Sequence, residues 1–428
     1  MKYALEKVTK CSGRIGTLSG IDRLPNINLR TPALVLHSKG GSIPHLSKEV
    51  LQYMNLEPTV IQYSLANTEN MEEAIRASGN GISYFVAQPE MISLLTLQDP
   101  AEFCQPNFHE KDLVPIYCRR GRRNFTVEQY MELVEAFQPD VFVPLFDGYT
   151  DEISSKKRVQ KSVERTETLV EQFLEERKKS GKLGQSTILA PLVGGYNINL
   201  REKYSKFISR FEHDFSGYLI AGLHSNGSTA SKIEQKSLLE IVSKICELLP
   251  SGKPRFAFGA FNPNAILEMI SCGVDVFDTS YPYLKTQQHR ALVFSFNVDE
   301  KEVDDRETEL DLTDSRWAQD FTGFVSSCAC LACTKHTRAY SQHLFNTREM
   351  LGPILLMIHN LHHFFEFFKV IQKHVVNDTL PDLQNHLKKQ KLVPYEEKEA
   401  SKDSKADGKF VKSTELNPDE LRPKKLKI

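Results

Sequence analysis

Short apolar runs alternate with longer helical patterns between residues 33 and 278 of this chain. Most of the runs are apolar throughout, which is typical of strands covered on both faces. Repeated strand–helix units predict a parallel α/β fold, and a closed (β/α)8 TIM barrel fits the length better than the alternative, a doubly wound open sheet. The runs expected to form strands are 33–37, 59–63, 83–86, 114–117, 141–146, 187–193, 217–222, 255–261 and 274–277.

Helical patterns fill the stretches between these runs. Residues 126–137 begin with a threonine that can cap a helix, and 155–180 form a long charged stretch. Apolar residues recur at helical spacing in 236–249 and in 262–273, which ends in a glycine, a helix stop signal. The sequence contains no Gly-x-Gly-x-x-Gly or Walker motif, so it does not predict a phosphate-binding loop of those types.

The charge composition shows that the chain is not basic overall. The formal net charge is −1, so any contact with RNA must come from a local basic patch. The most apolar run, 351–371, contains three histidines and a glutamate, and we interpret it as a buried or interfacial helix and not as a membrane span. The N-terminus shows no secretory signal, so we expect a cytoplasmic protein whose thiols are reduced.

Three of the eight cysteines lie within six residues, as Cys328, Cys330 and Cys333. The Cys-x-Cys-x-x-Cys spacing can bring three thiolates around one Zn²⁺, which prefers four ligands in a tetrahedron. The alternative is three reduced cysteines in a core. No fourth cysteine follows, and spacing alone leaves the fourth ligand open among the histidines that do: His336, His343, His359, His362 and His363.

The pattern of the chain changes after about residue 300. We predict a barrel over 1–300, an acidic loop over 301–325, a zinc-binding helical subdomain over 326–378 and a terminal helix over 379–393. Residues 394–428 are rich in charge and nearly free of large apolar side chains. They cannot bury enough surface to offset the entropy lost on ordering, so we predict a disordered tail.

The cysteine segment and the helical stretch after it resemble the zinc subdomain of the tRNA-guanine transglycosylases. In that family Cys-x-Cys-x-x-Cys is followed by "RAY-x-x-HL" and then by "E-x-LG-x-x-LL-x-x-HN", and both motifs occur here between residues 338 and 360. The family's fourth ligand is the histidine before the asparagine, which corresponds to His359. Further matches occur in order along the barrel, in "RTPALVLHSKGGSIPHLS", "QPDVFVPLFD", "GYLIAGL" and "ISCGVDVFD". The resemblance implies a (β/α)8 barrel with a zinc insertion.

Members of this family exchange a guanine in tRNA for a deazaguanine base, and their active site uses two carboxylate side chains. One attacks ribose C1′ and the other moves protons, and both must lie at the C-terminal ends of barrel strands. The resemblance places Asp278 in the position of the nucleophile and Asp147 where the family contacts the base. A structural alternative for both is capping of the helix or turn that comes after a strand.

The departures from the family pattern point away from catalysis. After Asp278 the chain keeps Pro282, but Tyr283 and Leu284 replace a Thr-Arg pair. The Asp-Ser-Gly-Gly turn of the proton-shuttling aspartate is missing, and we expect no aspartate in the corresponding region, 59–73 or its neighbour. The segment "PLVGGYN" lacks the glutamine found beside its glycine in catalytic members. We therefore interpret the chain as a non-enzymatic member that pairs with a catalytic barrel of the same family.

The resemblance then implies a heterodimer that exchanges guanine for queuine at the wobble position of tRNAs with GUN anticodons (Asn, Asp, His and Tyr). It also implies one structural zinc ion, and a cytosolic complex that associates peripherally with the mitochondrial outer membrane. Two alternatives are an active transglycosylase that uses Asp278 and a zinc-stabilised interaction scaffold. The candidates for contacts with tRNA phosphates lie in "CRRGRRNF" and are Arg119, Arg120, Arg122 and Arg123.

Overall fold

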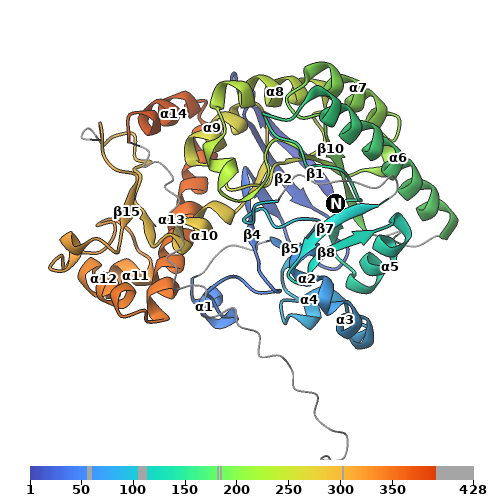
Figure 1. The fold of residues 1–428 in the computed structure, drawn as a ribbon. Coiled ribbons are helices and arrows are strands. Elements are labelled where there is room, and N and C mark those ends of the chain that lie inside the picture. The colour runs from blue at the N-terminus through green and yellow to red at the C-terminus, as the bar shows by residue number, and fades with distance from the viewer. Residues whose placement is uncertain (55–59, 105–112, 181–182, 184–185, 301–302, 392–428) are drawn as a thin grey trace, which may run out of the picture. The chain divides into compact units, whose positions relative to one another are not determined.

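Eight parallel strands in the described part of the chain close into a barrel, and they succeed one another around it in sequence order. Figure 1 shows helices around these strands. The computed structural model describes residues 1–54, 60–104, 113–180, 183, 186–300 and 303–391. The barrel closes where the last strand pairs with the first, so the open-sheet alternative is wrong. The strands are β4 (Ala33–His37), β5 (Val60–Ser64), β6 (Ile92–Thr96), β9 (Val141–Phe142), β10 (Thr187–Leu192), β11 (Gly217–Ile220), β12 (Arg255–Phe256) and β13 (Val276–Asp278).

Seven of these eight strands coincide with predicted runs, one predicted run is wrong, one predicted strand lies outside the barrel, and one barrel strand was missed. The run 83–86 lies in helix α4 (Gly81–Phe85), and 114–117 lies in β7 (Val114–Cys118), which pairs with β8 (Gly121–Phe125) in a hairpin outside the barrel. Strand β6 was not predicted. A short apolar run does not distinguish a buried strand from a helical turn by periodicity, which explains the first error.

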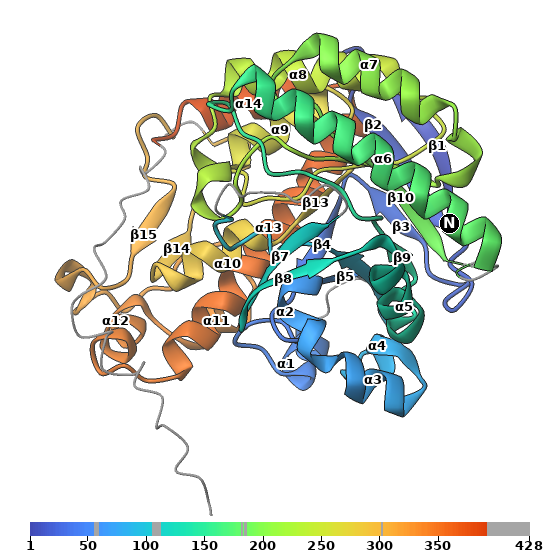
Figure 2. The ribbon, with the colours of Figure 1, turned by 45° about the vertical axis from the view of Figure 1, so that its right-hand side comes forward.

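Helices surround the barrel in both views (Figure 2). The predicted helix at 126–137 is confirmed as α5, where the Thr126 hydroxyl and the Gln129 side chain form a reciprocal capping box. Between strands and around the barrel lie α1 (Lys48–Tyr53), α2 (Leu65–Thr68), α3 (Glu72–Ser78), α4, α5 (Val127–Phe137), α6 (Lys156–Ser180), α7 (Ile198–Ser209), α8 (Gln235–Leu248), α9 (Pro263–Ser271) and α10 (Ser280–Gln287).

A small antiparallel sheet closes the N-terminal end of the barrel. It consists of β1 (Lys2–Val8), β2 (Arg14–Ser19) and β3 (Leu29–Thr31). Leu18 and Ile21 belong to one buried cluster with the interior residues of the barrel strands, such as Val35 and Val276. Because this end is plugged by apolar side chains, any site built from the loops of the barrel must lie at its C-terminal end.

The C-terminal region packs beside the barrel through helix α13 (Leu351–Val376), which contacts α10 (Figure 1). Part of the predicted acidic loop is ordered, because β15 (Glu309–Asp311) pairs with β14 (Arg290–Leu292). Residues 1–393 form one compact unit, so the division at residue 300 stays a prediction. The predicted disordered tail, 394–428, lies outside the described residues. The remaining helices are α11 (Leu331–Lys335), α12 (Arg338–Asn346) and α14 (Leu380–Lys388).

Helix α13 is long and apolar enough to cross a membrane by length and composition, with a mean hydropathy of 1.2 over its most apolar window. However, 67% of that window is buried inside the protein. Leu355, Ile358, Leu361, Phe364, Phe367 and Phe368 are all buried against the helix's own chain. The helix therefore packs as a core element, and little of its apolar surface remains for a partner.

Candidate functional site

Three cysteines and one histidine converge at the junction of α11 and α13. Nδ1 of His359 lies 3.8 Å from Sγ of Cys328, 3.6 Å from Sγ of Cys330 and 3.3 Å from Sγ of Cys333. All four ligand atoms lie within 4.8 Å of one another. Zinc bonds of about 2.0–2.3 Å in a tetrahedron require sulfur–nitrogen separations of about 3.5 Å. The four side chains therefore fit one ion of this type.

Hydrogen bonds around His359 set which of its nitrogens faces the sulfurs. Its Nε2 lies 2.8 Å from the carbonyl oxygen of Leu292, so Nε2–H donates and Nδ1 keeps its lone pair for a metal. The neighbouring Asn360 accepts from the Leu292 N–H at 2.8 Å and donates to the Arg290 carbonyl at 3.0 Å. The His-Asn pair thus ties α13 to both ends of strand β14, which explains why these two residue types are adjacent.

The other histidines do not join the cluster. His362 approaches only one of its sulfurs, with Nδ1 at 3.5 Å from Sγ of Cys328. His363 is buried against Phe294, with ring centroids 4.5 Å apart, and His336 stacks on Tyr340 at 5.5 Å. The set that the structure brings together is the one that the resemblance implies. Hydrogen bonds among the sulfurs lower the pKa of Cys328 and raise that of Cys330, because one shared proton is held between neighbouring thiols.

At the C-terminal end of the barrel, Asp278 ends β13 but is only 1% exposed. Oδ2 accepts from the Gly259 N–H at 2.6 Å, and Oδ1 accepts from the Ser280 N–H at 2.7 Å. Burial raises the pKa of Asp278 to about 6, although these hydrogen bonds favour the carboxylate. The carboxyl group lies at the C-terminal end of a barrel strand, but both of its oxygens are held by backbone donors.

A buried histidine–aspartate pair lies at the same end of the barrel, and sequence reasoning missed it. Nε2 of His37, the last residue of β4, lies 2.8 Å from Oδ1 of Asp99, and Asn67 donates to Oδ2 at 2.7 Å. Burial alone would raise the pKa of Asp99, but the charge of His37 and the hydrogen bonds lower it to about 2. The Tyr283 ring stacks on the His37 ring at 4.9 Å.

The expectation that no aspartate follows the early strands is therefore wrong. Asp99 lies three residues after the end of β6, the strand that was not predicted. It occurs in Asp-Pro and not in Asp-Ser-Gly-Gly, so the family's turn is missing as expected. Recognition of the apolar run "ISLLT" as a strand was the signal that could have found it.

Asp147 is also held by its own chain. Arg158 donates from Nη1 to Oδ2 at 2.9 Å and from Nη2 to Oδ1 at 2.5 Å, and Arg165 donates to Oδ2 at 3.3 Å. Both arginines project from α6, and Asp147 is fully buried. Its carboxylate thus joins the loop after β9 to the next helix, and neither oxygen is left to contact a base.

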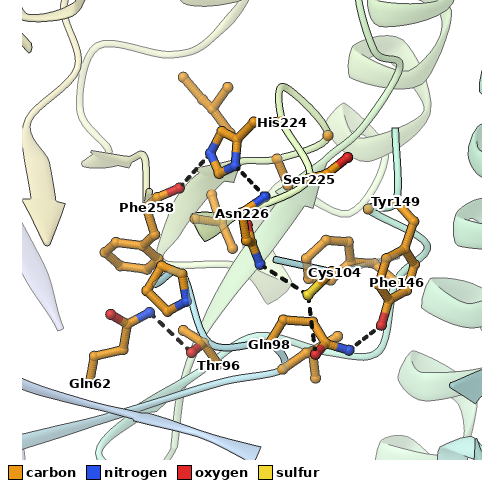
Figure 3. Close-up of a pocket in the computed structure, with 17 residues that line it drawn as sticks. Gln62, Thr96, Gln98, Cys104, Phe146, Tyr149, His224, Ser225, Asn226 and Phe258 are labelled. Atoms are coloured by element: carbon orange, nitrogen blue, oxygen red, sulfur yellow. Dashed lines mark hydrogen bonds between the residues drawn. The ribbon is translucent and has the colours of Figure 1, made fainter. Parts of the chain in front are cut away.

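A cavity of about 90 Å³ lies between these strand ends (Figure 3). Gln98 donates to the Tyr149 hydroxyl, which donates to the Pro115 carbonyl at 2.5 Å. His224 uses both nitrogens, one toward the Phe258 carbonyl and one toward the Asn226 N–H, and burial lowers its pKa to about 4. An engineered cavity of about 150 Å³ holds benzene. This cavity is too small for a purine while these side chains keep their positions.

The predicted RNA-contact arginines surround the tip of the β7–β8 hairpin, and all four are exposed. Arg119 and Arg120 form the turn and show no hydrogen bond or ion pair to other described residues. Arg123 pairs with Glu69 at 2.9 Å and Glu72 at 3.5 Å, which neutralises its charge. Arg122 lies on β8. The hairpin connects β6 to α5, so it belongs to the C-terminal end of the barrel.

Comparisons with known proteins agree with this architecture. A family model described as queuine tRNA-ribosyltransferase matches residues 9–392. The chain is 60% identical over the full length of both chains to the queuine tRNA-ribosyltransferase accessory subunit 2 of Aedes aegypti. It is 62% identical to the protein of that name from Culex quinquefasciatus, over 92% of each chain. It is 42% identical to that of Drosophila melanogaster, over 91% of this chain and 93% of the other. This chain belongs to the queuine tRNA-ribosyltransferase family, the tRNA-guanine transglycosylases.

Proposed function

We propose that this chain is the non-catalytic subunit of a heterodimeric queuine tRNA-ribosyltransferase. The single observation that carries the proposal is the state of its two candidate carboxylates: Asp278 is buried on backbone donors and Asp147 is paired with two arginines. A nucleophile must reach ribose C1′, and a base-binding group must have a free oxygen. The accessory-subunit names of the relatives support the same interpretation.

In this role the chain docks a catalytic barrel and helps to hold tRNA, and the partner exchanges guanine for queuine at the wobble position of tRNAs with GUN anticodons. One zinc ion held by Cys328, Cys330, Cys333 and His359 joins the cysteine loop to α13. The ion supplies no chemistry for base exchange in this proposal, since it has four protein ligands and no open position. Its role is to fix the subdomain beside the barrel.

The test of this function is the exchange of labelled guanine into a GUN tRNA by the purified chain alone, by the catalytic subunit alone and by their mixture. We expect exchange at full rate only in the mixture, and we expect Asp278→Asn in this chain to leave that rate unchanged. Exchange by this chain alone, abolished by Asp278→Asn, would contradict the proposal.

One observation favours the second candidate, an active transglycosylase. The His37–Asp99 pair is a buried acid–base pair near Asp278, and the charge of His37 acts on the pKa of Asp278. This candidate predicts a covalent adduct between Asp278 and tRNA, which denaturing electrophoresis of the chain with labelled tRNA detects. The Tyr283→Ala variant removes the ring stacked on His37. If neither the wild type nor this variant forms the adduct, the second candidate function is excluded.

We propose that Arg119 and Arg120 contact tRNA phosphates, with Lys156 and Lys157 at the start of α6 on the same end of the barrel. All four are exposed, and this end of a barrel carries the loops that meet a substrate. Replacement of Arg119 and Arg120 by alanine should weaken tRNA binding and reduce the salt slope by about 0.9 for each lost phosphate contact. The control is Lys178→Ala with Lys206→Ala, near the C-terminal ends of α6 and α7. A salt slope that falls equally in both variants would overturn the assignment.

For the location in the cell we propose the cytosol, with peripheral association with the mitochondrial outer membrane, on the support of the resemblance alone. Fractionation of cells with and without a high-salt wash tests this, since a peripheral protein leaves the membrane fraction in salt.

A further inference from the structure

A cleft of about 610 Å³ opens beside the metal cluster. Its walls are residues 293–297, residues 325–329 and the face of α13 that carries His362, His363 and Glu366. Among the four cluster residues, Cys328 alone lines this cleft. Cys330 is 4% exposed and His359 is fully buried, while Cys333, although half-buried, contributes nothing to the cleft wall. The cluster is thus approached from this cleft through a single sulfur.

His362 lines the same cleft beside that sulfur. Its ring is partly exposed, and its Nδ1 lies 3.5 Å from Sγ of Cys328. His359, three residues earlier on α13, has its Nδ1 within 3.8 Å of all three sulfurs. Four ligands complete a tetrahedron, and His359 holds the fourth position. His362 is therefore placed to touch an ion on its way to the cluster, outside the final set.

Charged groups of both signs line the cleft. The carboxylate of Glu300 pairs with the guanidinium of Arg306 at 2.7 Å. Glu366 is one helical turn beyond His362 on α13, so the two share a helix face, and its carboxylate pairs with Lys369 at 2.8 Å. The Nε2 atom of His363 is buried and has no hydrogen-bond partner among the described residues. Glu366, His362 and Cys328 thus line one cleft, and two of them offer ligand types that zinc prefers.

We propose that this cleft is the route by which zinc enters and leaves the cluster, and that His362 is a transient ligand that passes the ion to Cys328. The neutral imidazole binds through the lone pair of Nδ1. As the Cys328 thiolate binds, the nitrogen–zinc contact breaks and the imidazole is restored unchanged. A transient ligand lowers the barrier in both directions, so it changes the rates and not the affinity.

The proposal rests on the cluster holding zinc, and the test separates the two claims. Zinc content by mass spectrometry reports the site, and a chromophoric chelator reports the rates of uptake and release. In His362→Ala we expect one zinc per chain, an unchanged affinity, and uptake and release that are both slower by about fivefold or more, which corresponds to roughly 1 kcal/mol of barrier. The matched control is His343→Ala, an exposed histidine on α12 in the same subdomain.

A second variant tests the route through the cleft while the His362 imidazole stays in place. Ala329 is exposed on the cleft wall, and Ala329→Trp should slow uptake and release while the zinc content stays at one. Rates in both variants equal to those of His343→Ala would overturn the proposal. Loss of zinc from His362→Ala would also overturn it, because His362 would then be a permanent ligand. A wild-type chain that holds no zinc would instead refute the metal site itself.

Discussion

The metal cluster and the mouth of the barrel use their chemically active side chains in opposite ways. In the cluster, three sulfurs and the Nδ1 atom of an imidazole lie within 4.8 Å of one another, so these ligand atoms can bind one ion. At the mouth, the carboxylates of Asp278, Asp147 and Asp99 each accept hydrogen bonds from their own chain. The difference teaches that hydrogen-bond partners, and not residue type alone, decide which side-chain atoms remain available to bind an ion or a substrate.

The largest expected effect is the loss of the cluster. Cys330→Ser removes a buried ligand and leaves three, so zinc content should fall from one to near zero and the subdomain should lose several kcal/mol of stability. Mass spectrometry of bound zinc and thermal unfolding measure the two effects. Cys118→Ala, a half-buried cysteine outside the cluster, is the control and should keep its zinc. Equal stability of the two variants would show that the cluster does not support the fold.

The next largest effect is expected when the ion pair between Asp147 and its two arginines at the mouth of the barrel is broken. Asp147→Asn leaves Arg158 and Arg165 without their carboxylate, and we expect a loss of about 3 kcal/mol, as for other buried pairs that lose one partner. Urea unfolding measures it, with Glu152→Gln in the same loop as the exposed control. If the Asp147 carboxylate instead contacted the exchanged base, the variant would keep its stability and the complex would lose exchange activity.

A smaller effect concerns Asp99 and depends on pH. Its folded-state pKa of about 2 lies below the ordinary value of 3.8, so the carboxylate contributes stability of about 2 kcal/mol above pH 4. This contribution is lost as the pH falls from about 4 to 2. Asp99→Asn should therefore be less stable than the wild type at pH 7, and the gap should close in acid. A gap that stays constant between pH 7 and pH 3 would show that His37 and Asp99 do not form a charged pair.

Much of the fold was predictable because buried parallel strands leave a strong apolar signal. Seven barrel strands and the helices between them can be inferred from such runs and from caps such as Thr126. The helix at 81–85 was mistaken for a strand, because four or five apolar residues carry no period that separates strand from helix. The strand at 114–117 was predicted correctly, but it lies in a hairpin outside the barrel. The zinc ligands show the same limit, since spacing could not choose among the histidines and the resemblance did.

The sequence by itself determined which residue types were present: the thiols and imidazoles of the cluster, the barrel strands, and an aspartate at the end of β13. Only the tertiary structure decided what those groups can do. Arg158 and Arg165 reach Asp147 from a helix, Tyr283 covers His37 from another, and Asp99 meets His37 across 62 residues. Hydrogen bonding and burial act through space between segments distant in the chain, and they set whether a carboxylate is free to react.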